Sequence, residues 1–162
     1  MNVVRVDEMD IIIATKDNNI KIKQSVVNKM KGYIQFDKKS FEAGGILIGY
    51  EAVDGDIIIE YATEPYKGDN RKRKFFHRKD SKHNEILDKI WEREGKIHMY
   101  IGEWHTHPEN QPEYSYQDKK NWTKISKQMS QQKEYYIHII VGITEIRCWQ
   151  YNRKCEDIIR IL

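Results

Sequence analysis

Short apolar runs alternate along the chain with segments whose apolar positions recur at helical spacing. Runs rich in isoleucine and aromatic residues predict strands at 9–14, 46–50, 57–62, 98–107, 135–143 and 145–151, with a short strand at 75–78. Helical spacing predicts helices at 25–35, 81–94 and 115–130. The apolar stripe of the second helix is formed by Ile86, Leu87, Ile90 and Trp91.

Turn residues between these segments support the same division. Asp54-Gly55 between two apolar runs is a strong hairpin signal, and Gly95 is a typical residue just beyond a helix end. Residues 157–162 fit either an edge strand or a short helix. The order of elements predicts an α+β fold in which a mixed sheet is flanked by helices. The length of 162 residues favours one domain spanning 1–162.

Composition excludes several classes of protein. Hydrophobic residues make up 39% and charged residues 33% of the chain, which is typical of a soluble globular protein. The longest apolar runs are too short to cross a bilayer, so no membrane association is expected. The first ten residues carry acids where a signal peptide would be apolar, which favours the cytoplasm. Cys148 and Cys155 fit that compartment as structural thiols.

A basic cluster covers residues 71–74 and continues at Arg78 and Lys79, with Phe75, Phe76 and His77 between. It predicts either a loop that faces a substrate or nucleic acid, or a solvated strand edge. The net charge of only +3 does not require a polyanionic partner. We therefore interpret the cluster as a surface feature and do not expect a nucleic-acid partner.

Two histidines two residues apart carry the clearest chemical signal. His105 and His107 lie in the strand predicted at 98–107, where alternate side chains point to the same side of a sheet. Two neutral imidazoles side by side suit a divalent cation such as Zn²⁺. Alone, such a pair is also compatible with two hydrogen-bonded histidines that bind no metal.

Ser115 and Asp118 stand three residues apart where the third helix is predicted to begin. Residues at this spacing share a helix face, so Asp118 could supply a third metal ligand if the preceding loop folds back. Three protein ligands leave one position open, which is typical of catalytic zinc sites. The same spacing also fits a helix-capping box without a metal.

Taken together, His105-Thr106-His107-Pro108, six intervening residues, Ser115 and Asp118 resemble the signature of JAMM (MPN-plus) metalloproteases. In that family a glutamate precedes a glycine-rich strand, and Glu42 matches this position before Ala43-Gly44-Gly45. The resemblance spans at least residues 42–118. It implies the JAMM/MPN architecture, which is similar to that of cytidine deaminases.

The resemblance also implies a mechanism. One Zn²⁺ held by His105, His107 and Asp118 would activate a water molecule, and Glu42 would carry its proton to the leaving amine. Ser115 would donate a hydrogen bond to the tetrahedral oxyanion. From the residues alone, Glu42 could equally be an exposed acid that ends the first helix or caps a turn.

A finer resemblance points to the bacterial JAMM isopeptidases of CBASS antiphage operons. It rests on Gly102-Glu103-Trp104 before the histidine motif, on Leu87 and Trp91 in the preceding helix, and on Gly68-Asp69 before Arg71. The implied substrate is a protein, either an extended C-terminal tail or a ubiquitin-like conjugate of a cGAS-like nucleotidyltransferase. The basic segment 71–79 would border its groove.

Three alternatives follow from the same residues. One is a JAMM peptidase that processes a sulfur-carrier or ubiquitin-like precursor, and another is a non-catalytic MPN scaffold. A zinc deaminase is excluded because His105-Thr106-His107 lacks the glutamate of the required H-x-E element and the chain has no CxxC.

The remaining polar residues near the motif receive structural interpretations. Glu103 shares the predicted face of His105 and could orient a ligand histidine or form a cross-strand salt bridge. The histidines interpreted as surface or packing residues are His77, His83, His98 and His138.

Overall fold

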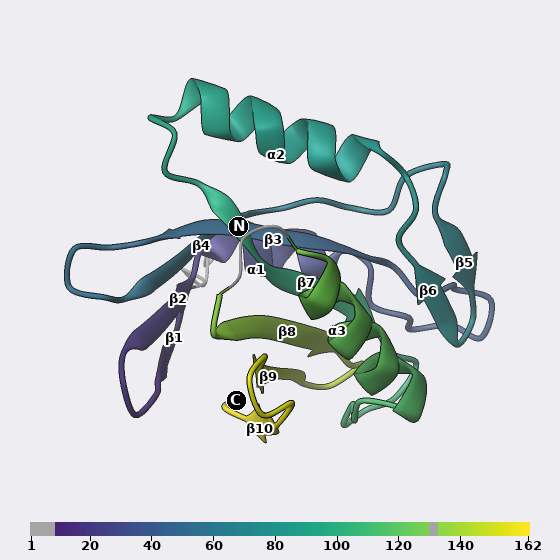
Figure 1. The fold of residues 1–162 in the computed structure, drawn as a ribbon. Helices are drawn as coiled ribbons and strands as arrows, with labels where there is room; N and C mark the ends of the chain where they lie inside the picture. The colour runs from purple at the N-terminus through teal and green to yellow at the C-terminus, as the bar shows by residue number, and fades with distance from the viewer. Residues whose placement is uncertain (1–8, 130–132) are drawn as a thin grey trace, which may run out of the picture.

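The computed structural model describes residues 9–129 and 133–162. The acid-rich start of the chain and the end of the third predicted helix at Ser130 therefore fall largely or wholly outside the described residues. Ten strands and three helices form the described part, in an α+β arrangement with a curled mixed sheet (Figure 1). The predicted fold class is confirmed.

Eight strands build the main sheet in the order β1-β2-β4-β3-β7-β8-β9-β10. The pairs β2–β4 and β7–β8 are parallel and the other pairs are antiparallel. The bounds of these strands are β1 Ile11–Ala14, β2 Asn19–Ile22, β3 Gly44–Glu51, β4 Ile57–Ala62, β7 Met99–Thr106, β8 Tyr135–Val141, β9 Ile146–Asn152 and β10 Ile158–Arg160. The last segment, left open by its sequence, is thus an edge strand.

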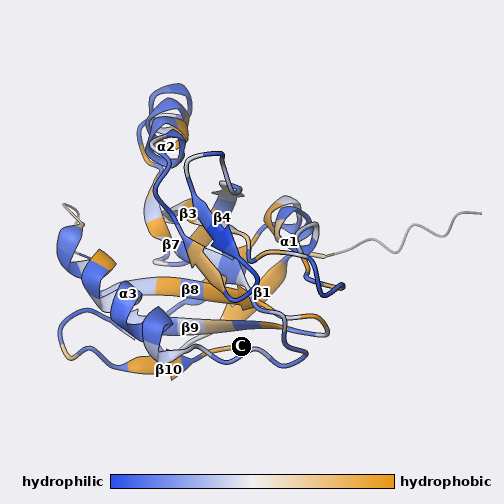
Figure 2. Cartoon of the chain, turned by 90° about the vertical axis from the view of Figure 1, so that its right-hand side faces the viewer, coloured by the Kyte–Doolittle hydropathy of each residue, from blue (hydrophilic) through white to orange (hydrophobic). Residues whose placement is uncertain are grey.

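The sheet is covered on both faces. On one face, α1 (Gln24–Lys31) buries Val26, Val27 and Met30 with Leu47. On the other face, α2 (Lys82–Arg93) and α3 (Tyr116–Gln128) pack with Ile46 and Ile48, which alternate with Leu47 along β3. Figure 2 shows the hydrophobic residues concentrated in the central strands, whereas α3 is mostly hydrophilic.

Two helices differ from their predictions. The first ends at Lys31 instead of Gln35, because Gly32 and Tyr33, both weak helix formers, follow in a tight turn. In α2, Trp91 leaves the predicted apolar stripe. It is exposed on the outer side, where the Lys96 ammonium lies 5.3 Å from its ring. Gly95 ends this helix with φ +79°, as its position predicts.

Two strands were missed by the pattern. The short β2 pairs with β1 as a hairpin, and β5 (Asn70–Lys72) pairs with β6 (Phe75–His77) in a separate two-stranded sheet. β5 has the sequence Asn-Arg-Lys, which carries no apolar signal, so only its pairing makes it a strand. In Figure 1 the hairpin β5–β6 stands beyond the end of the main sheet, on the side where α3 begins.

Among the described residues, each helix is too short or too polar to pass through a bilayer. Both cysteines are free thiols. Cys148 is buried in the core, as a structural thiol would be, whereas Cys155 is exposed.

Candidate active site

Strand β7 places both motif histidines on the α3 side of the sheet. A bulge at Ile101, between the pairs Leu47–Gly102 and Ile48–Tyr100, sets which side chains of the following residues face α3. His105 and His107 then alternate as predicted, and their Nε2 atoms lie 3.0 Å apart. Both rings are almost completely buried.

Asp118 reaches these histidines from the first turn of α3. Its Oδ1 lies 3.2 Å from Nε2 of His105, and its Oδ2 lies 3.2 Å from Nε2 of His107. Although burial disfavours the charged form, the neighbouring His105 holds the pKa of this carboxyl well below its usual range. The same contact raises the pKa of His105 against the effect of its own burial.

The capping box at the start of α3 is formed as well. Ser115 Oγ accepts a hydrogen bond from the Asp118 amide at 3.0 Å, and the Ser115 amide donates to Asp118 Oδ2 at 2.8 Å. The two interpretations of this spacing are therefore compatible, because one carboxylate both caps the helix and contacts the histidines.

These three side chains fit a tetrahedral cation. A metal ion with bonds of 2.0–2.1 Å separates neighbouring ligand atoms by about 3.3 Å. The observed separations of 3.0–3.2 Å between the two Nε2 atoms and the Asp118 oxygens are close to that value. His107 Nδ1 also lies 3.0 Å from Oε1 of Glu109, within ion-pair distance but without the geometry of a hydrogen bond.

Glu42 lies beside this group, just before β3. Only 5% of the residue is exposed, and its Oε1 is 3.9 Å from Nε2 of His107. Burial raises the pKa of Glu42 to about 7, and the two histidines oppose this shift. The alternative of an exposed acid at a helix end is wrong, because α1 ends eleven residues earlier and the carboxyl is buried.

The backbone around Glu42 is held by hydrogen bonds from other segments. Its amide donates to the Lys72 carbonyl at 2.8 Å, and its carbonyl accepts from Arg71 Nε at 2.8 Å. Arg73 likewise donates to the backbone of Asp37. These two arginines of the basic cluster therefore support the loop that carries Glu42.

A buried glutamine that sequence reasoning missed joins this loop to β7. Gln35 is 1% exposed, and its Nε2 donates to the carbonyls of Ser40 and Arg73. Its Oε1 accepts from the hydroxyl of Thr106, which itself accepts from the Ala43 amide. Thr106, which lies between the two histidines, is thus hydrogen-bonded to Ala43, which lies next to Glu42.

Replacing Gln35 with leucine is expected to lower the free energy of unfolding by about 2–4 kcal/mol, because buried partners lose their hydrogen bonds. We also expect a lower kcat with unchanged metal content, since the displaced group is the Glu42 loop. Denaturant unfolding, metal analysis and kinetics measure the three quantities. A variant as stable as the wild type would show that these bonds do not hold the loop.

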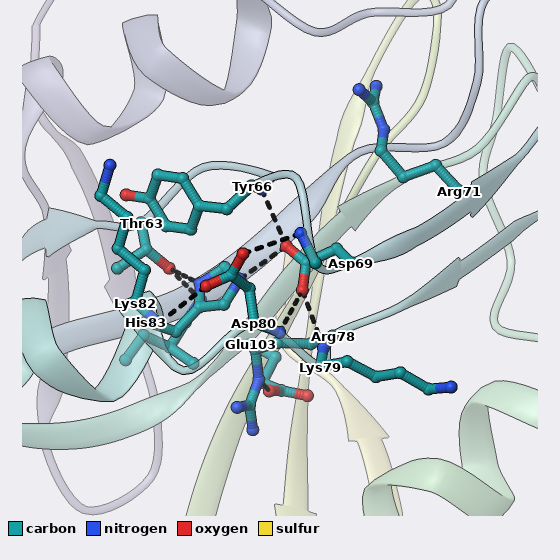
Figure 3. A network of polar contacts seen from close by, with 12 residues as sticks. Thr63, Tyr66, Asp69, Arg71, Arg78, Lys79, Asp80, Lys82, His83 and Glu103 are labelled. Carbon is teal, nitrogen blue, oxygen red and sulfur yellow. Dashed lines mark hydrogen bonds and ion pairs between the residues drawn. The ribbon is translucent and has the colours of Figure 1, made fainter.

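A second buried network fixes the hairpin β5–β6 at its base (Figure 3). His83 Nδ1 lies 2.6 Å from Thr63 Oγ1, and its Nε2 lies 2.7 Å from Asp69 Oδ2. Asp69 also accepts from the amides of Lys79 and Asp80. His83 is completely buried, so this arrangement is a structural brace and not a catalytic triad open to substrate.

The other polar side chains follow their structural interpretations. Glu103 forms a salt bridge with Arg78, the alternative to orienting a ligand histidine. His138 is buried and stacked on Trp122, with centroids 4.3 Å apart. His98 is also buried. Its Nε2 lies within hydrogen-bond distance of Glu60 and within ion-pair distance of Glu94. The sequence did not reveal this group.

Hairpin β5–β6 and helix α3 form the walls of a groove over the motif residues. One cavity of about 460 Å³ adjoins His105 and is here called the His105 chamber. A second of about 240 Å³ adjoins Glu42, His107 and Ser115 and is called the Glu42 chamber. Residues shared by both linings are Phe75, Phe76, Gln117, Asp118 and Asn121. Of the basic segment 71–79, residues 74–78 line these two chambers.

Phe76 can lie over the start of β3 because Gly44 has no side chain. A Cβ at Gly44 would be 2.6 Å from the Phe76 ring. Gly44 therefore gives the groove wall its close approach to the sheet.

The pKa of Glu42 leads to a prediction for the metal-free protein. A carboxyl with a folded pKa of about 7 and an ordinary value of 4.5 binds its proton more tightly in the folded state. The resulting stability is complete below the ordinary pKa and is lost as the pH rises through the folded pKa. With a chelator present, wild type should lose about 2–3 kcal/mol relative to Glu42→Gln between about pH 5 and 8. The same difference in free energy of unfolding between the two proteins at both pH values would contradict this expectation.

This chain is similar in sequence to several known proteins and similar in fold to a solved structure. Residues 34–152 match the family model for prokaryotic homologs of the JAB domain. A protein of Escherichia coli (strain TW11681), named CD-NTase/cGAS isopeptidase, is 36% identical over 106 residues, which cover 65% of this chain and 67% of that protein. Proteins of the same name from Vibrio cholerae (serotype O1, strain ATCC 39315 / El Tor Inaba N16961) and Pseudomonas aeruginosa (strain BWHPSA011 / Pa011) are 32% and 33% identical. These matches cover 71% and 80% of this chain and 75% and 82% of the relatives.

The solution structure of protein DSY2949 from Desulfitobacterium hafniense has the same fold. Its TM-score is 0.56 at 18% identity, and the match covers 87% of this chain and 88% of that one. The family match extends over most of the chain and includes Glu42, both histidines, Ser115 and Asp118. The chain therefore belongs to the family of prokaryotic homologs of the JAB domain.

Proposed function

We propose that this protein is a zinc-dependent isopeptidase whose single Zn²⁺ is held by His105, His107 and Asp118. The observation that carries the proposal is the convergence of these three side chains beside the buried carboxyl of Glu42. The two Nε2 atoms lie 3.0 Å apart, and each lies 3.2 Å from a different oxygen of Asp118. A cation at this position would have an open side towards the groove, as catalytic zinc sites do.

Each residue then has a chemical task. When bound, zinc supplies a Lewis acid that activates water and polarises the scissile carbonyl. Glu42 takes the proton of the attacking water and passes it to the departing lysine amine. Ser115 keeps its hydroxyl proton for the oxyanion, because its oxygen accepts the Asp118 amide.

The proposed substrate is a conjugate in which the C-terminal tail of a cGAS-like nucleotidyltransferase is joined to a lysine of another protein. The relatives from three bacteria bear the name CD-NTase/cGAS isopeptidase, which supports this choice. An extended tail fits the groove, since β6 lines it and, within the described residues, pairs only with β5. Its free edge could accept a tail as an added strand. We place the reaction in cytoplasmic antiphage defence.

A pair of matched substrates tests the proposal. One carries the nucleotidyltransferase tail on a lysine side chain, and the other carries the same tail in a linear fusion. We expect the zinc-loaded protein to release the tail from lysine, a chelator to stop release, and added zinc to restore it. Cleavage of the linear fusion alone would favour precursor processing. A zinc-loaded protein that binds both substrates and cleaves neither would be a scaffold, and the proposal would be wrong.

A further inference from the structure

Most of the polar side chains that line the His105 chamber are basic or amide side chains. The charged or titratable residues in its lining, besides the proposed metal ligands, are His77, Arg78, Glu103, Lys120 and Lys124. The amides Gln117, Asn121 and Gln128 add further hydrogen-bonding groups along α3. Its volume of about 460 Å³ lies within the usual range for ligand sites.

Both carboxylates in this lining already have partners. Glu103 is paired with Arg78, and Asp118 contacts the two histidines and caps α3. Lys120 and Lys124 are exposed and lie one helical turn apart. Across residues 9–129 and 133–162, neither has a carboxylate within ion-pair distance, in contrast to Lys127, which pairs with Glu156.

The positive charges around the chamber affect the pKa of His77, which belongs to β6 on the other wall. Burial lowers the pKa of this imidazole, and the charges of Lys79, Lys124 and Arg78 lower it further. Lysines from α3 and basic residues from β6 and the segment after it therefore act on the same space. The Glu42 chamber differs, because Lys74 is the one lysine or arginine in its described lining and Glu109 faces it.

We propose that the His105 chamber binds acidic side chains of the substrate polypeptide, close to the scissile bond, through Lys120 and Lys124. This inference rests on the proposed function, because it assigns a preference to the same groove. The expected occupant is a chain segment with aspartate or glutamate. Unpaired lysines of this kind select complementary charge and accelerate encounter.

Binding can be measured without cleavage. The probes are fluorescein-labelled, unstructured peptides that differ only in glutamate, glutamine or lysine at the same positions. They are titrated into the zinc-loaded Glu42→Ala protein at low ionic strength. We expect the glutamate peptide to bind about tenfold more tightly than the lysine peptide. High ionic strength should reduce that ratio.

Charge reversal identifies the groups responsible. Lys120→Glu with Lys124→Glu, made in the same background, should remove or invert the preference. The matched control is Lys89→Glu with Lys119→Glu, two exposed lysines outside both chamber linings, which should keep it. Thermal melts and zinc content confirm that each variant is folded and loaded.

Two results would overturn the inference. One is that the Glu42→Ala protein shows no preference for the glutamate peptide, or that this preference survives the charge reversal at Lys120 and Lys124. The other is a single-stranded oligonucleotide that binds these lysines more tightly than the glutamate peptide. Failure of the proposed function looks different, since the wild-type protein would then leave conjugates intact while the peptide preference and its reversal remained.

Discussion

Replacing Glu42 with glutamine should lower kcat by about 10²- to 10⁴-fold, the usual contribution of a general acid–base group. Glutamine has nearly the same shape but cannot accept and return a proton. Glu42 is 3.9 Å from His107 Nε2 and is not among the three proposed ligands, so the variant should keep the metal content of the wild type. Single-turnover kinetics on the lysine-linked conjugate, with metal analysis of the same samples, measures both quantities.

A matched acid-to-amide variant separates proton transfer from a general loss of charge. Glu113 is mostly exposed and lies outside both chamber linings, so Glu113→Gln should leave kcat close to the wild-type value. A Glu42→Gln protein that retains zinc and full kcat would show that another group carries the proton. Loss of zinc from that variant would instead place Glu42 among the metal's supporting ligands.

Removal of the metal is expected to produce the largest loss of stability. Zinc at about a thousand times its dissociation constant stabilises the folded state by about 4 kcal/mol. For a domain of this size, that corresponds to a fall in Tm of about 8–16 °C when a chelator is added. Activity should disappear with the same titration, and added Zn²⁺ should restore both.

Asp118→Asn provides the control for this experiment. An asparagine oxygen can still accept the Ser115 amide and cap α3, but it is a much weaker zinc ligand than a carboxylate. The variant should therefore have a low Tm that no longer responds to chelator. A chelator effect of wild-type size in Asp118→Asn would locate the stabilising metal elsewhere.

The position of the two histidines could be predicted because it depends on local geometry alone. Alternation along β7 suffices to bring His105 and His107 to one face, and the helix-start spacing suffices to pair Ser115 with Asp118. That α3 folds back over β7 was an expectation from the family resemblance. Glu42 was placed in the same way, since nothing in its own segment indicates a buried carboxyl.

The parts that could not be predicted depend on distant pairing. β5 is polar throughout, and it becomes a strand only because β6 lies beside it. Gln35 looks like the end of a helix, yet its role comes from partners 38 and 71 residues away. The basic cluster was interpreted as a surface feature, and the hydrogen bonds of its arginines to the Glu42 loop appear only in the folded chain.

The capping box at Ser115 and Asp118 has a consequence for how the metal is acquired. The carboxylate is already immobilised by the helix backbone, so its rotamer entropy is lost during folding and not at the moment of binding. Its depressed pKa also means that an arriving cation displaces no proton from Asp118. Folding of α3 thus prepares a rigid, ionised carboxylate for the ion, and binding should require little rearrangement of that helix.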